Sequence, residues 1–162
     1  MLVLILKNMV KIQHSGFIEV ERDSAYVYSF LIDPYKVSSI FPMVENVNVI
    51  DENNFYVKVK LKLGIIQGNA DLKLKFVERK EPLLAKLKGE GSGLKSIINF
   101  ELNFYLEKEK DNTKIIWFFE GDVSGLAASL GSPVLKASLE AIVNQVIQNL
   151  KKNIESEKLT KP

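Results

Sequence analysis

The sequence contains no cysteine, a single histidine, His14, and only two arginines, Arg22 and Arg79. Without cysteine the chain cannot form a disulfide, a thiolate nucleophile, an iron–sulfur cluster or a Cys-ligated zinc site. His14 has no neighbouring acid to orient it as a catalytic base, and together with scattered carboxylates it makes no recognisable set of metal ligands. We therefore predict that the chain binds no metal or cofactor, has no catalytic residues and is not an enzyme.

A strong excess of charge is also lacking, since 22 lysines and arginines against 20 acidic residues give a net charge of +2. Nucleic-acid binding is not expected at so small a charge, and two arginines offer few bidentate phosphate contacts. Because the chain can form no disulfide, a reducing cytoplasm is the predicted location.

The N-terminal apolar run is too short to cross a bilayer. Met1 to Leu6 also lack the basic residues and the small-residue cleavage site of a signal peptide. We expect residues 1–9 to be a flexible lead-in, with Met9 as an alternative start, and residues 10–158 to form a single domain.

Residues 44–124 alternate apolar and polar side chains with the period of two that is typical of half-buried strands. Phe55, Val57 and Val59 share one face, for example, while Lys58 and Lys60 share the other. Together with a first strand from Val10 to Val20, the pattern predicts seven strands, at about residues 10–20, 44–50, 55–63, 66–76, 83–91, 98–106 and 115–123.

Two short helices are predicted after the first strand and a long one near the C-terminus. Asp23 and Ser24 offer capping oxygens to a helix over about residues 25–32, and Pro34 starts a second over about 35–40. Ser132-Pro133, a capping hydroxyl before a proline at the first helical position, starts the long helix. Its apolar stripe must be buried against one face of the sheet. The pattern therefore predicts an α+β fold, a curved seven-stranded antiparallel sheet wrapped around a long C-terminal helix.

Four segments carry a resemblance to a known family, residues 41–47 (FPMVENV), 57–64, 87–93 (LKGEGSG) and 123–131 (VSGLAASLG). With the order of the elements, they resemble the START-like helix-grip (SRPBCC) superfamily, and within it the family of carbon monoxide dehydrogenase G subunits, over residues 10–155. The sequence has Pro42-Met43 where the family usually has Pro-Gly, and Gly64-Ile65 where it usually has Gly-Pro.

The resemblance implies a deep hydrophobic cavity between the sheet and the long helix, used across the superfamily for lipids, sterols and other apolar molecules. Members of the G-subunit family often accompany molybdenum-containing hydroxylases as accessory proteins, with a proposed role in membrane attachment or maturation. We expect a non-catalytic binding or carrier protein for a lipid-like or quinone-like molecule. The alternatives are an accessory, membrane-recruitment or assembly protein of a carbon monoxide dehydrogenase-like complex and, less favoured, a cyclase or hydrolase.

Apolar side chains on the inner faces of the predicted strands and helix are expected to line the cavity. Glycines at inner positions, Gly68, Gly89, Gly91 and Gly121, are expected to curl the sheet and to leave room inside it. A pocket of about 300 Å³, the lower end for ligand sites, would cost roughly 7 kcal/mol if left empty, so it should be filled or collapsed. The expected lining residues are Val59, Leu61, Leu72, Leu74, Leu87, Phe100, Leu102, Trp117, Phe119, Leu139 and Ile142.

Seven lysines share the outward phase of three strands that should be neighbours. A basic patch on the convex side of the sheet could dock oxidoreductase subunits or the anionic inner surface of a membrane, which would make the protein peripheral there. The simpler interpretation is a solvated face that resists aggregation. The seven residues of this lysine patch are Lys58, Lys60, Lys62, Lys73, Lys75, Lys86 and Lys88.

Overall fold

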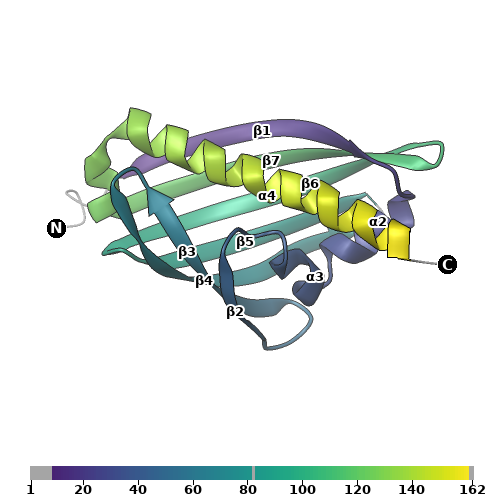
Figure 1. The fold of residues 1–162 in the computed structure, drawn as a ribbon, viewed down its shortest axis with the longest axis horizontal. Coiled ribbons are helices and arrows are strands. Elements are labelled where there is room, and N and C mark those ends of the chain that lie inside the picture. Colours follow the sequence, from purple (N-terminus) through teal and green to yellow (C-terminus); the bar gives the residue numbers. More distant parts are fainter. Residues whose placement is uncertain (1–8, 82, 161–162) are drawn as a thin grey trace.

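A computed structural model describes residues 9–81 and 83–160 of the chain. Residues 1–8 of the predicted lead-in lie outside the described residues. The α+β fold is confirmed, because one curved antiparallel sheet of seven strands packs against a long C-terminal helix (Figure 1).

The sheet has the strand order β1-β7-β6-β5-β4-β3-β2, so each strand from β2 to β7 pairs with its neighbour in sequence and β1 closes the far edge beside β7. Every pair is antiparallel. The strands are β1 (Val10–Val20), β2 (Val44–Val49), β3 (Asn54–Leu63), β4 (Ile66–Lys80), β5 (Leu84–Gly93), β6 (Ser96–Glu109) and β7 (Asn112–Gly125).

The alternation of the sequence fixes which side chains point inward. In β3, Phe55, Val57 and Val59 are buried while the lysines between them are exposed, as predicted. The fifth strand begins at Leu84 and not at Leu83, because the Leu83 N–H donates to the Lys80 carbonyl in the preceding turn. Leu83, where the predicted strand began, is consequently 57% exposed.

Aspartates cap both short helices. Asp23 accepts a hydrogen bond from the Tyr26 N–H at the start of α2 (Ser24–Leu31). Asp33 accepts one from the Tyr35 N–H at the start of α3 (Pro34–Ser38), with proline in the first turn. The two helices cover the end of the sheet near the C-terminus of the long helix (Figure 1).

The long helix α4 (Ser132–Thr160) follows a 3₁₀ turn, η1 (Leu126–Leu130). Its first backbone bond runs from the Leu135 N–H to the Gly131 carbonyl, so Ser132 is the first helical residue and not the predicted cap. The helix lies across the concave side of the sheet (Figure 1), and Leu135, Leu150 and Ile154 of its apolar stripe are fully buried. Helix and sheet share one hydrophobic core.

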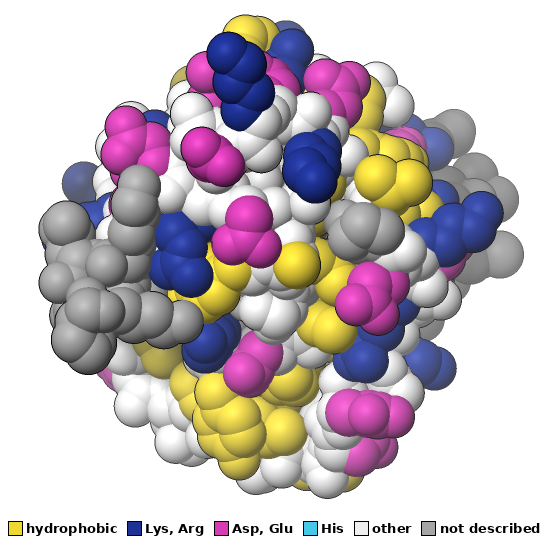
Figure 2. Space-filling view, turned by 90° about the vertical axis from the view of Figure 1, so that its right-hand side faces the viewer, with side chains coloured by type: hydrophobic (Ala, Val, Ile, Leu, Met, Phe, Trp, Pro, Cys, Tyr) yellow, Lys and Arg dark blue, Asp and Glu magenta, His cyan; other side chains and the backbone are white. Residues whose placement is uncertain are grey.

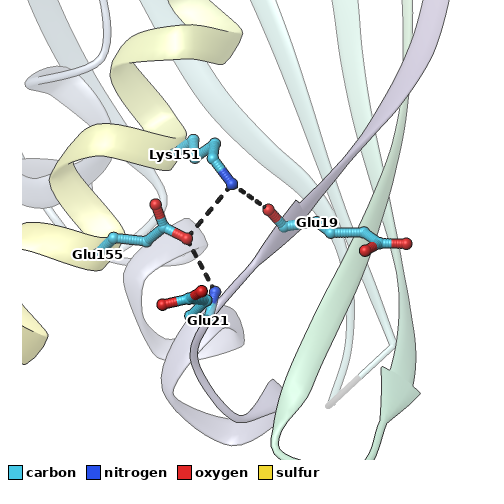
Figure 3. Close-up of polar contacts among 4 residues, drawn as sticks. All are labelled: Glu19, Glu21, Lys151 and Glu155. Atoms are coloured by element: carbon cyan, nitrogen blue, oxygen red, sulfur yellow. Dashed lines mark hydrogen bonds and ion pairs between the residues drawn. The ribbon is translucent and has the colours of Figure 1, made fainter.

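Polar contacts hold the C-terminal half of α4 against β1 (Figure 3). The Glu155 carboxylate accepts a hydrogen bond from the Glu21 N–H at 3.0 Å and pairs with Lys151 at 3.3 Å. Lys151 also donates to the Glu19 carbonyl at 2.5 Å. On the opposite flank, the Asn149 amide donates to the Ile40 carbonyl at 3.0 Å. These bonds satisfy backbone groups where β1 and the α3 segment end, and so they fix the position of this half of the helix.

Candidate ligand-binding site

An apolar cavity lies between the concave face of the sheet and α4. Its volume is about 70 Å³, and every side chain that lines it is apolar. The walls come from β3, β4, β6, β7, the α3–β2 connection and the middle of α4. The lining residues are Phe41, Pro42, Val59, Leu61, Leu72, Ile98, Phe100, Leu102, Phe119, Leu139, Ile142, Val143 and Val146.

An open groove of about 810 Å³ lies outside this cavity. It runs between the outer edge of β3, the start of β4, the segment before β2 and α4. Its lining residues are Pro42, Met43, Lys60, Leu61, Lys62, Gly64, Gln67, Gly68, Ser138, Ala141, Ile142 and Gln145. Three of them, Pro42, Leu61 and Ile142, also line the cavity. Groove and cavity are therefore adjacent and are separated by these three side chains.

The groove exists because β2 is shorter than β3. The pairing of the two strands ends at Val44 opposite Val59, with one further bond from the Lys60 N–H to the Met43 carbonyl. Beyond that point the edge of β3 faces α4, to which it is tied by a bond of 3.1 Å from the Gly64 N–H to the Ser138 hydroxyl. A long strand beside a short one thus leaves an opening between the sheet edge and the helix.

Eight of the eleven side chains expected at the cavity line it. The other three, Leu74, Leu87 and Trp117, are buried in the core but are not among its lining residues. Five lining residues were not predicted from the sequence, namely Phe41, Pro42, Ile98, Val143 and Val146. Ile98 lies on the inward side of the strand alternation, and Val143 and Val146 lie on the apolar stripe of the helix, so the sequence pattern could have identified all three. The position of Phe41-Pro42 depends instead on the path of the chain between α3 and β2.

The cavity is smaller than about 300 Å³, the lower end for ligand sites, because aromatic rings cover inner glycines. A Cβ atom added at Gly89 would lie 2.2 Å from Cζ of Phe100, and one at Gly121 would lie 3.1 Å from Cζ of Phe119. The rings of Phe100 and Phe119 are themselves adjacent, with centroids 5.8 Å apart. The prediction that these glycines leave room inside the sheet is therefore wrong, because neighbouring side chains fill the space.

His14 connects the sheet to the helix. Its Nε2 lies 2.8 Å from Oδ1 of Asn144 on α4, and its ring meets the edge of Trp117 at a centroid distance of 5.0 Å. Among residues 9–81 and 83–160, no group of three or more His, Asp or Glu side chains is placed to hold a metal ion. Burial raises the pKa of the Tyr28 hydroxyl, which keeps this core side chain neutral near pH 7.

The lysine patch lies on the outer face of adjacent strands, as its phase predicts. Carboxylates are interspersed with it, however. Lys60 pairs with Glu45 at 3.6 Å and Lys86 with Glu78 at 3.4 Å. Acidic residues also face three further lysines across the ladders, Asp71 opposite Lys58, Glu90 opposite Lys73 and Glu101 opposite Lys88. Mixed charge also covers the end of the molecule at the C-terminus, where basic and acidic side chains alternate (Figure 2).

A curved antiparallel sheet that grips a C-terminal helix across an apolar cavity defines the START-like helix-grip class of proteins. Residues 16–155 match the model of the CoxG family, the G subunits of carbon monoxide dehydrogenase. The match covers most of the chain, and the protein belongs to this family. No curated protein matched the chain.

Solved structures share the fold at low sequence identity. A conserved protein from Geobacillus kaustophilus is 21% identical, with a TM-score of 0.78 over 88% of this chain and 94% of that one. A START superfamily protein from Mycobacterium smegmatis is 13% identical, with a TM-score of 0.67 over 91% and 99%. Norcoclaurine synthase from Thalictrum flavum is also 13% identical, with a TM-score of 0.65 over 98% and 92%.

These similarities establish the fold and the family, and the fold is one that binds hydrophobic ligands. One similar structure is a synthase, so the fold by itself does not decide between binding and catalysis. Among the helices of the described residues, none has an apolar stretch long enough to span a bilayer.

Proposed function

We propose that the protein is a non-catalytic carrier that encloses part of a hydrophobic small molecule, lipid-like or quinone-like, between the sheet and α4. The observation that carries this proposal is that the open groove adjoins the apolar cavity, with Pro42, Leu61 and Ile142 lining both. A purely structural core needs no apolar cavity beside an open groove, because it gains stability by close packing and by excluding solvent from all sides.

The dimensions support binding that extends from the groove inward. The inner cavity of about 70 Å³ is well below the about 300 Å³ at which ligand pockets begin, whereas the groove of about 810 Å³ lies within their range. The bulk of a ligand therefore occupies the groove, and its innermost part reaches the cavity.

The test is uptake of N-phenyl-1-naphthylamine, an uncharged apolar dye whose fluorescence rises when it leaves water. We expect the wild-type protein to bind the dye, and Ile142→Trp to weaken binding about tenfold or more because the larger ring fills the passage. Val134→Trp is the matched control, since Val134 lies on the same helix, is 44% exposed and lines neither groove nor cavity.

Absence of dye binding by the wild-type protein, together with absence of any co-purifying apolar molecule in native mass spectrometry, contradicts the proposal. Equal weakening by Ile142→Trp and Val134→Trp would place the binding site away from the passage.

The family match supports a second candidate function, that of an accessory protein in a complex of the carbon monoxide dehydrogenase type. In this case the lysine patch is the docking surface. Lys73→Glu with Lys88→Glu tests it, because both side chains are exposed and neither lines the groove. Loss of co-purification with oxidoreductase subunits is the expected result, and unchanged co-purification rules the patch out as the contact.

A further inference from the structure

The groove outside the cavity carries positive charge, although the walls of the cavity are entirely apolar. Two of its lining residues are lysines, Lys60 and Lys62, and none is an aspartate or a glutamate. Gln67, Ser138 and Gln145 add neutral hydrogen-bonding groups to the same walls. A molecule bound here therefore meets a cationic, hydrogen-bonding surface outside and only hydrocarbon inside.

These two lysines differ from most of the lysine patch in what faces them. Across the β3–β4 ladder, Lys60 faces Asn69 and Lys62 faces Gln67, and both of these are uncharged. Most other lysines of the patch have a carboxylate in the facing position or in an ion pair. Lys62 at the groove therefore has no carboxylate in the facing position, and Lys60 has one only through Glu45.

Lys60 has a partner, but a weak one. Its ammonium lies 3.6 Å from the Glu45 carboxylate, and 59% of its side chain is exposed, so the pair is well screened by water. Among the carboxylates that the structure describes, none lies within ion-pair distance of Lys62. Lys62 is therefore free to bind an anion in the groove. Lys60 can also bind it, because breaking the screened ion pair with Glu45 costs little free energy.

We propose that the groove binds the anionic head of a single-chain amphiphile, a long-chain carboxylate, whose hydrocarbon chain passes Leu61 and Ile142 toward the cavity. This inference rests on the proposed function and adds the class of the head group. The ammonium groups and the glutamine amides are donors that match carboxylate oxygens, and these charge-assisted bonds are stronger than neutral ones. The apolar passage takes up the part of the ligand that cannot form such bonds.

The experiment compares dodecanoate with 1-dodecanol, which share a chain length and differ in charge. Each competes with N-phenyl-1-naphthylamine for the protein at pH 8 and low salt, where the carboxylate is ionised. We expect dodecanoate to compete about five- to tenfold more strongly than the alcohol, as two exposed lysines would provide. Added salt should reduce this preference and leave competition by the alcohol unchanged.

Substitutions then locate the head group. Lys60→Gln with Lys62→Gln should remove the preference for dodecanoate without changing the affinity for dodecanol, and the corresponding arginine pair should retain it. Lys73→Gln with Lys75→Gln, which neutralises two exposed lysines of the next strand outside the groove, is the matched control. Glu45→Gln should strengthen dodecanoate binding because it releases Lys60.

Three results would overturn the inference. Equal competition by acid and alcohol in the wild-type protein would show that charge plays no part, while leaving the proposed function intact. A preference that survives Lys60→Gln with Lys62→Gln would place the head group elsewhere. Failure of the dye and of both competitors to bind would refute the proposed function as well.

Discussion

Met43 is one of four non-glycine residues with a left-handed backbone in the part of the chain that the structure describes, together with Leu94, Lys95 and Lys110. Its φ of 53° lies in the left-handed region, which costs a residue with a Cβ about 1–2 kcal/mol. Its side chain is 67% exposed at the edge of the groove, so packing in the core does not explain the conformation. Non-glycine residues held in this region are found preferentially at functional sites.

Replacing Met43 by glycine or by alanine separates the backbone from the side chain. Both changes remove the thioether, but only glycine relieves the strain, at the cost of greater freedom in the unfolded chain. We expect Met43→Gly to be about 0.5–1 kcal/mol more stable than Met43→Ala in urea unfolding, while both bind the apolar dye more weakly than the wild type. Equal stability of the two variants would mean that the backbone is not strained at this position.

Asp51 organises the turn between β2 and β3. Its Oδ1 accepts hydrogen bonds from the N–H groups of Asn53 and Asn54, both at 2.8 Å, and from the Asn54 amide at 3.0 Å. These bonds favour the ionised form, and they hold the pKa of the carboxyl below its ordinary value of 3.8. Because the pKa is lower in the folded state, the contribution to stability is present above pH 3.8 and is lost as the pH falls through the folded value.

Asp51→Ala should therefore be less stable than the wild type at pH 7, and the difference should shrink as the pH falls below about 4. Urea unfolding at pH 7 and pH 3 measures it. Glu52→Ala removes a carboxylate from the same turn but none of these bonds, and serves as the control. A difference that stays constant across this range would mean that the hydrogen bonds to Asp51 do not depend on its charge.

At the scale of elements, the strands and helices are predictable because each signal is local. The period of two in β3 to β7 and the three- and four-residue spacing in α4 require one buried face each, and the caps at Asp23 and Asp33 lie next to the helices that they start. No local sequence signal predicts the groove. It depends on where β2 stops pairing with β3, which is set by the chain path through Phe41-Pro42 and by no pattern within either strand.

The inner glycines illustrate the same limit. The sequence shows that Gly89 lies on the inward face of β5, but not that the ring of Phe100 on the next strand covers it. Packing of a large residue over a small one is a property of a strand pair, and only the three-dimensional arrangement determines which residue fills the space.

This packing predicts a strong effect of one methyl group. Gly89→Ala would place a Cβ atom 2.2 Å from Cζ of Phe100, so the ring must move, and we expect a loss of about 1–3 kcal/mol in urea unfolding. Adding Phe100→Leu should recover part of the loss, since the shorter side chain makes room. Lys88→Ala, at the exposed position before it on the same strand, should change stability by less than about 0.5 kcal/mol. Additive effects of Gly89→Ala and Phe100→Leu would contradict direct contact.

At the scale of the whole molecule, α4 both packs against the sheet and forms a wall of the groove. The C-terminal half is fixed to β1 and to the α3 segment by hydrogen bonds, through Lys151, Glu155 and Asn149. The preceding part of the helix, through Ser138, Ile142 and Gln145, forms one wall of the groove. This part is also tied to the sheet, by the bond from the Gly64 N–H to the Ser138 hydroxyl and by the contact between His14 and Asn144, so the same helix completes the fold and borders the groove.

The same substitution at a cavity residue and at a core residue distinguishes ligand binding in the cavity from general loosening of the core. Phe100 and Phe104 are both buried, at 8% and 1% exposure, but only Phe100 lines the cavity. Phe100→Leu and Phe104→Leu should each lower stability by about 1–2 kcal/mol, because each removes buried ring atoms. Only Phe100→Leu should also raise the affinity for N-phenyl-1-naphthylamine, since the space it creates joins the apolar path from the groove.

Urea unfolding and dye titration of the two variants give both quantities. If affinity rises equally in both, the dye is binding to loosened core in general and not to the cavity. If it rises in neither, although stability falls in both, the cavity is not part of the binding path. A rise confined to Phe100→Leu links the 70 Å³ behind Leu61 and Ile142 to uptake from the groove, which makes the interior a ligand site and not a packing defect.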